Sequence, residues 1–265
     1  MLRARASNPL PTGIARPQGR VDFTRISPLM QASLTQGIAN MEHHQKTSRG
    51  MTLVELMVVV GMLSALLGIA YSSMTDWQQN ERTSAFARSI ADFYRFAASE
   101  AVRTENVQIV FLAAGGAGDT AGAALLDSGG NPVPVLLLDD GPIGSAGQNC
   151  RIDAGEPTHF LPAANGVNWG FASSGGAKAP GDSTAIVSTS GSSFATPSGS
   201  ASTWVAFMPD GRPLAFDAAC SMGQLGSGNG GVYLTNGERD FGIVLTPLGG
   251  VRIHTWNPGA GQWRS

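Results

Sequence analysis

The fold of this chain is decided by one stretch, Arg49-Gly50-Met51-Thr52-Leu53-Val54-Glu55-Leu56, which opens an apolar run that continues to Tyr71. Between Met51 and Tyr71 the run holds a single charged residue, Glu55. At about 1.5 Å rise per residue, a helix of this length spans roughly 30 Å, the thickness of a bilayer's hydrocarbon core. The run therefore predicts a membrane-spanning helix, and a charge inside such a helix needs a reason.

The charges on either side of the run predict its orientation. Lys46 and Arg49 precede it, and Asp76 is the first charge after it. By the positive-inside rule, residues before the run lie in the cytoplasm and residues after it lie outside. Two alternatives stay open. A cleaved signal peptide has a shorter apolar region, and a plain signal anchor leaves Glu55 as a tolerated charge near the helix end.

The order of glycine, apolar run and glutamate carries a resemblance. Gly50 and the ten residues after it closely resemble the class III signal of type IV pilins and pseudopilins. The resemblance implies that a prepilin peptidase cuts after Gly50 and that the new N-terminal residue, Met51, is N-methylated. It also implies that Glu55 guides assembly by pairing with the N-terminal amine of a neighbouring subunit. Met51 departs from the pattern, since phenylalanine is usual at that position.

Residues 1–50 are predicted to form the leader peptide that this cleavage removes. The leader is long for the family, and residues 1–40 contain five arginines and four prolines without a helical or strand period. These properties indicate disorder or a misassigned start codon, and a start at Met41 leaves an ordinary leader. His43 and His44 then belong to the leader and are not metal ligands, because no third ligand is in reach.

One long helix is predicted to extend past the apolar run. From Ile69 to Ala114 the chain has neither glycine nor proline. Beyond residue 77, apolar residues recur at steps of three and four and define one face: Phe86, Ile90, Phe93, Ala97 and Ala101. We therefore predict a helix of about 52–103, with a transmembrane half at 51–71 and an amphipathic half at 72–104. Two helices broken near residue 72 are the alternative.

Residues 105–265 are predicted to form a periplasmic β-rich domain with one modest core. The strand candidates are 107–111 (half-buried), 133–138, 204–208, 232–235, 241–246 and 251–256. Residues 172–203 are mostly Ala, Ser, Gly and Thr, which predicts a flexible surface loop or insertion pinned by Ile186, Val187 and Phe194. The fold class expected is therefore α+β, with a long N-terminal helix packed on an antiparallel β-sheet domain.

Two short motifs in this domain narrow the resemblance. Phe207-Met208-Pro209-Asp210-Gly211-Arg212 and the segment from Gly242 to Ile253 look like the GspH/FimT group of minor pseudopilins and minor pilins. The resemblance implies a pilin-like fold for the whole mature chain. The middle of the chain, about 112–203, carries no recognisable resemblance.

Cys150 and Cys220 are the only cysteines, and the predicted topology places both outside the cytoplasm, where disulfides persist. An even count without a CxxC motif favours one structural disulfide between them. A reactive thiol is the alternative.

Few residues indicate chemistry, and we expect no enzyme, no metal site and no cofactor. Motifs for zinc, acyl-transfer or nucleotide chemistry are missing from the sequence. Asp139, Asp140 and Asp210 are interpreted as turn residues, and His159 and His254 as surface or structural residues. From Met51 onward there are 10 Lys and Arg and 17 Asp and Glu, a net charge of −7, which argues against bulk DNA binding. A local nucleic-acid site at Arg252 and Arg264 stays open.

The resulting functional hypothesis is a minor pseudopilin of a type II secretion system, placed in the bacterial inner membrane with its C-terminal domain in the periplasm. Its expected partners are other pilins or pseudopilins, prepilin peptidase and the inner-membrane assembly platform. The alternatives are a minor pilin of a type IV pilus, acting in assembly priming, adhesion or DNA uptake, and a single-span periplasmic binding protein or enzyme.

Overall fold

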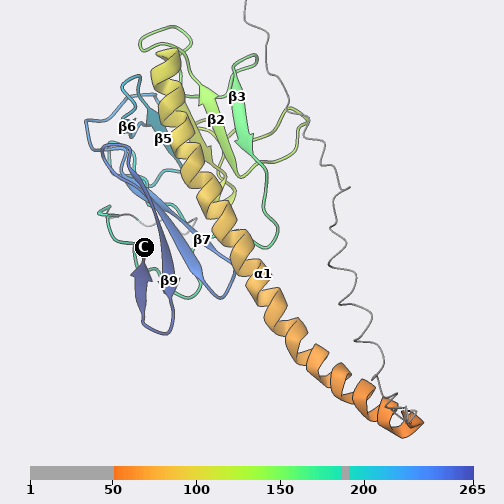
Figure 1. Ribbon diagram of the computed structural model, residues 1–265. Helices are drawn as coiled ribbons and strands as arrows, with labels where there is room; N and C mark the ends of the chain where they lie inside the picture. The colour runs from red at the N-terminus through yellow and green to blue at the C-terminus, as the bar shows by residue number, and fades with distance from the viewer. Residues whose placement is uncertain (1–50, 185, 187–190) are drawn as a thin grey trace, which may run out of the picture. The chain divides into compact units, whose positions relative to one another are not determined.

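The computed structural model describes residues 51–184, 186 and 191–265 and, inside the helix, leaves out the side chains at 69, 70, 72 and 73. The predicted leader with Gly50, Met41 and its histidines lies outside the described residues, as does Val187. Contacts divide the chain into residues 1–58 and residues 59–265. The described part is one helix followed by antiparallel strands, which confirms the α+β class (Figure 1).

Helix α1 runs from Leu53 to Thr104 without a break, within one residue of the predicted bounds. It ends where Glu105 takes a left-handed conformation with φ 58°, the usual geometry of a residue that follows a helix. In the part of the chain that the structure describes, no helix is long and apolar enough to cross a membrane. The membrane-spanning role predicted for residues 51–71 is therefore not confirmed and stays a prediction.

Among the described residues, ten strands form two antiparallel sheets of five strands each. The first sheet has the order β3-β2-β1-β5-β6, with β1 Gln108–Leu112, β2 Val135–Asp139, β3 Thr158–Leu161, β5 Trp204–Phe207 and β6 Pro213–Leu214. The second has the order β10-β9-β8-β7-β4, with β4 Asn168–Trp169, β7 Gly230–Thr235, β8 Asp240–Leu245, β9 Val251–Asn257 and β10 Gln262–Arg264. A short 3-10 helix, η2 Ala114–Gly116, follows β1.

All six predicted strands are present, and the last two of them, β8 and β9, form a hairpin around Pro247 with Ile243 opposite Ile253. Strands β3, β4, β6 and β10 were not predicted. Three of these have two or three residues, too few to show a period, and β3 is an edge strand whose side chains are mostly exposed. Short edge strands carry little of the hydrophobic signal on which such predictions depend.

The C-terminal part of α1 lies across the β domain (Figure 1), and the main core lies between this part of the helix and both sheets. The predicted apolar face of the helix is buried there, together with side chains from β1, β2, β5, β7 and β8. Phe86, Ile90 and Ala97 are at most 8% exposed. This confirms the predicted amphipathic face of α1.

Strand β1 differs from the prediction, because all five of its residues are buried and not only alternate ones. Val110 and Leu112 belong to the core under α1, while Ile109 and Phe111 belong to a second apolar cluster on the other face of the sheet. The second cluster includes Cys150 and Phe216. Loops that follow the strands cover this face, so the first sheet has an apolar core on each of its two faces. The sequence predicted a single core.

The segment 172–203 also makes more buried contacts than a surface loop would. Phe194 is 1% exposed and packs edge-to-face on Tyr94 of α1, with ring centroids 6.3 Å apart. Ser192 and Ser193 are fully buried, and the Ser193 N–H donates to the carbonyl of Gly231 in β7 at 2.9 Å. A composition of small residues therefore fits close packing against the second sheet.

Candidate functional site

The first turn of α1 is built around Thr52. The backbone N–H of Glu55 donates to the Thr52 hydroxyl at 3.3 Å, and the N–H of Leu56 donates to the Thr52 carbonyl at 3.1 Å. Thr52 is therefore the N-cap of the helix, and Thr-x-x-Glu is the capping-box pattern. The spacing Thr-x-x-Glu alone signals this N-cap, which was not among the predictions for this stretch.

The predicted processing residues lie at this helix start. Gly50 is outside the described residues, and Met51 is 59% exposed. Glu55 is exposed in the first turn, where the helix dipole favours a carboxylate. The roles predicted for these residues in cleavage, N-methylation and register stay predictions.

Residues 51–77 present a long apolar surface. Its large apolar side chains are between 40% and 74% exposed: Met51, Leu53, Val54, Leu56, Met57, Val58, Val59, Val60, Met62, Leu63, Leu66, Leu67, Tyr71, Met74 and Trp77. A Cβ placed on Gly61 or Gly68 would meet no atom within 4 Å. Exposed apolar surface of this extent is typical of protein or membrane interaction sites.

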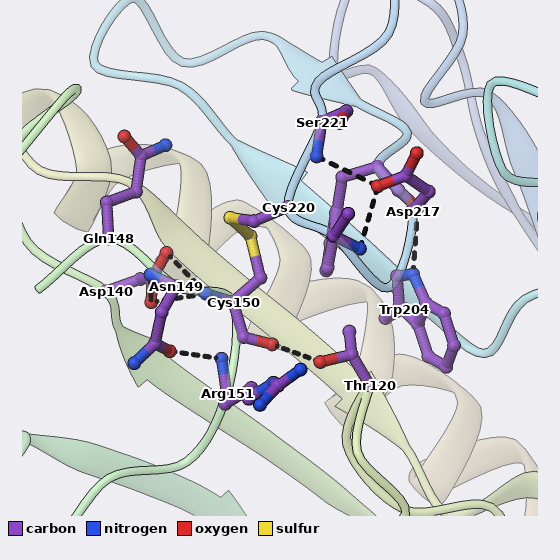
Figure 2. The surroundings of a disulfide bond; sticks show 12 residues. Thr120, Asp140, Gln148, Asn149, Cys150, Arg151, Trp204, Asp217, Cys220 and Ser221 are labelled. Carbon is purple, nitrogen blue, oxygen red and sulfur yellow. Dashed lines mark hydrogen bonds between the residues drawn. A yellow bond between two sulfur atoms is a disulfide. The ribbon is translucent and has the colours of Figure 1, made fainter.

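A disulfide joins Cys150 to Cys220, with their Cα atoms 5.4 Å apart (Figure 2). It links the loop after β2 to a tight turn after β6, over the second apolar cluster. The predicted disulfide is therefore present, in place of the reactive thiol that was the alternative. Because each sulfur is bonded to the other, the two cysteines offer no thiolate to a metal ion.

Hydrogen bonds from three sides fix the loop that carries Cys150. The buried Asp140 carboxylate accepts from the backbone N–H groups of Asn149 at 3.2 Å and Cys150 at 2.9 Å. The Thr120 hydroxyl donates to the Cys150 carbonyl at 2.8 Å, as Figure 2 shows, and buried Asp119 accepts from the N–H of Ile152 at 3.1 Å. Cys150 is thereby held with a left-handed φ of 60°.

Cys220 lies in a turn whose hydrogen bonds recur in a second turn of the chain, where glycine occupies the same position. Asp217 accepts from the N–H groups of Cys220 and Ser221, and Cys220 has a φ of 61°. The turn from Asp127 to Asn131 has the same hydrogen bonds, with Gly130 in the corresponding position. A non-glycine residue in this conformation is disfavoured, so the disulfide explains why cysteine stands there.

The two aspartates after β2 have different roles. Asp139 accepts from the N–H of Gly141 at 3.1 Å, which confirms the predicted turn role. Asp140 is 1% exposed and supports the cysteine loop instead. Burial raises the pKa of Asp140 to about 6, against the lowering effect of its two backbone hydrogen bonds; the charges of Glu156 and Asp153 raise it further. The sequence contained no signal for this role.

The remaining predicted residues do not form one site. His159 stacks edge-to-face on Phe96 of α1. His254 is 2% exposed, and burial together with the nearby Arg252 lowers its pKa. Arg252 and Arg264 lie on different strands; Arg264 lines a hollow of about 260 Å³ together with Arg239.

Comparison with known families identifies the N-terminal motif. The prokaryotic N-terminal methylation motif matches residues 45–71, which end in the exposed apolar part of α1. The match supports a type IV pilin-like protein, of the pilin or pseudopilin kind, that assembles with other pilins and is processed by prepilin peptidase. It covers a short part of the chain and does not resolve the GspH/FimT group. No curated protein and no solved structure matches the chain.

Proposed function

We propose that this chain is a minor pseudopilin of the GspH/FimT group, a structural subunit without enzymatic activity in a type II secretion system. The observation that carries the proposal is the continuity of the methylation motif with a helix of 52 residues. The motif supplies a processed, apolar end. The later part of the same helix is the core element of the β domain. One helix therefore connects the proposed assembly segment to a folded domain.

The proposed location is the bacterial inner membrane, with the residues before the helix in the cytoplasm and the β domain in the periplasm. The exposed apolar side chains of residues 51–77 support insertion, since a soluble helix rarely leaves so much apolar surface unpaired. The Cys150–Cys220 disulfide supports an oxidising compartment for the β domain. In the assembled pseudopilus, helices of sister subunits would cover this apolar surface.

Mass spectrometry of the mature N-terminus tests the processing step. We expect a chain that begins at Met51 with a methylated amine, because the resemblance of Gly50 and the residues after it to the class III signal implies cleavage after Gly50. Gly50→Val is the matched control, since a branched side chain next to the cleaved bond should leave the leader attached. A chain that keeps its leader, or one cut after Tyr71, would contradict the pilin class and favour a membrane-anchored binding protein or enzyme.

Deletion of the gene tests which filament the subunit joins. We expect loss of protein secretion across the outer membrane with surface pili unchanged. Restoration by the wild-type chain, and not by Gly50→Val, ties the defect to the processed protein. Loss of pili or of DNA uptake with normal secretion would instead assign the chain to a type IV pilus as a minor pilin.

A further inference from the structure

The disulfide lies next to a buried carboxylate that the proposed function does not use. One carboxylate oxygen of Asp140 and the two sulfurs of Cys150 and Cys220 all lie within 4.8 Å of one another. Asp140 is 1% exposed, and its carboxylate also accepts the N–H of Cys150. Asp140 is therefore tied to the backbone of the same cysteine whose sulfur it approaches.

The two cysteines differ in access. Cys150 is fully buried, whereas Cys220 is half-buried in its turn. A thiol reagent from solvent therefore meets the sulfur of Cys220 first. In an exchange reaction the sulfur that is not attacked leaves as a thiolate, which here is Cys150. A thiolate in a buried site is costly unless a proton is supplied to it.

We propose that Asp140 is the proton donor and acceptor for Cys150 when the Cys150–Cys220 bond is broken and formed. During formation, the Cys220 thiol loses its proton to water and attacks a small disulfide, which gives a mixed disulfide and one released thiolate. Asp140 takes the proton of the Cys150 thiol. The Cys150 thiolate then attacks the Cys220 sulfur and expels the second thiolate. The protein loses two electrons and two protons, and the oxidant becomes two thiols.

Reduction by a dithiol runs the same steps backwards. The reductant's thiolate attacks the Cys220 sulfur, the S–S bond breaks, and the protonated Asp140 gives its proton to the leaving Cys150 sulfur. Because burial raises the pKa of Asp140 to about 6, the carboxyl is a proton donor below this pH and a carboxylate above it. The charged groups around it are Asp153 and Glu156 from the same loop, and Asp217 lies in the facing Cys220 turn.

The test measures the rate at which dithiothreitol reduces the oxidised full-length protein between pH 5 and pH 8. Alkylation and mass spectrometry count the free thiols with time, and each rate is divided by the concentration of dithiothreitol thiolate. We expect this normalised rate to fall as pH rises through about 6 in the wild-type protein. In Asp140→Asn it should be flat and, at pH 5, about a hundredfold below the wild-type rate, the lower end of what general acid catalysis contributes.

Two matched controls separate proton transfer from damage to the loop. Asp119→Asn removes a buried carboxylate that holds the same loop through Ile152, and Glu156→Gln removes a titrating neighbour. Asp119→Asn should keep the wild-type profile, whereas Glu156→Gln should keep the inflection but move it to lower pH, because the charge that raises the pKa of Asp140 is removed. A wild-type profile without an inflection, or one that Asp140→Asn retains, would overturn the proposal. If Asp140→Asn does not fold, the wild-type profile alone still tests the proposal, because a profile without an inflection contradicts it.

Discussion

At the scale of single residues, the register role proposed for Glu55 and a capping role at the same position can be separated by different variants. The proposed register role needs the charge, whereas a capping role at position N3 needs only a hydrogen-bonding side chain of the same length. The contacts at the helix start show the Thr52 side of a capping box. Glutamine keeps the length and the capping chemistry and removes the charge.

We predict that Glu55→Gln is processed normally but is not incorporated into filaments, because an amide cannot pair with a charged amine. Thr52→Val should weaken the helix start by about 1 kcal/mol and leave incorporation intact. The measurement is the fraction of each mature variant that is recovered with sheared or crosslinked filaments. If Glu55→Gln is incorporated normally and Thr52→Val is missing from the filaments, Glu55 acts in capping alone.

Two buried tyrosines form a matched pair for a second prediction. The Tyr233 hydroxyl donates to Asp182 at 2.5 Å and accepts from the N–H of Ala179 at 3.1 Å. The Tyr94 hydroxyl is equally buried but has no hydrogen-bond partner among residues 51–184, 186 and 191–265. A hydrogen bond to a charged group is worth about 1.5–3 kcal/mol, whereas an unpaired buried hydroxyl is a cost to folding.

We therefore expect opposite results from the same change of tyrosine to phenylalanine. Tyr233→Phe should lower the free energy of unfolding by about 2 kcal/mol, because it removes a bond to the Asp182 carboxylate. Tyr94→Phe should leave it unchanged or raise it. Urea unfolding curves with equal slopes measure both differences. Equal losses in the two variants would contradict the prediction, because they would mean that the Tyr94 hydroxyl stabilises the fold as much as the hydrogen-bonded Tyr233 hydroxyl does.

At the scale of elements, the packing of α1 depends on small side chains. Four fully buried alanines lie on its core face: Ala87, Ala91, Ala97 and Ala101. They let the helix backbone approach the two sheets closely, with the larger Phe86, Ile90 and Tyr94 between them. A core packed to this density tolerates added volume poorly.

We predict that Ala97→Leu lowers the free energy of unfolding by about 1–3 kcal/mol, because the added volume has no space to occupy. Ala85→Leu is the matched control on the same helix, since Ala85 is exposed. Leucine is nearly as good a helix former as alanine, so this control should change stability by less than about 0.5 kcal/mol. Similar losses in both variants would contradict close packing of α1 on the sheets.

At the scale of the whole molecule, the elements that could be predicted are those whose residues show a hydrophobic period or a known turn motif. Phe86, Ile90 and Ala97 recur at helical spacing, and the residues around Pro247 alternate on either side of a turn, so α1 and the β8–β9 hairpin were predictable. The full burial of β1 was not predictable, because the loops that cover its second face show no hydrophobic period. Phe194 in the core and Asp140 beside Cys150 depend on contacts between segments far apart in the sequence.

The disulfide belongs to this scale, because it ties two such segments across the second apolar cluster. Cys150 and Cys220 are 70 residues apart, and in the chain-entropy account a closed loop of that length stabilises the fold by about 4 kcal/mol. We predict a loss of this size for the double variant Cys150→Ala, Cys220→Ala. The core between α1 and the sheets does not include either cysteine, so it should remain folded.

Hydrogen exchange followed by mass spectrometry locates the loss. Amides in residues 140–156 and 215–222 should lose protection first, since their contacts depend on the bridge, while β7 and β8 should stay protected. Reduced wild-type protein is the matched control and should show the same regions opening. Uniform loss over both sheets would mean that the second cluster and the main core unfold as one cooperative unit, and that the bridge stabilises the whole domain and not one face of it.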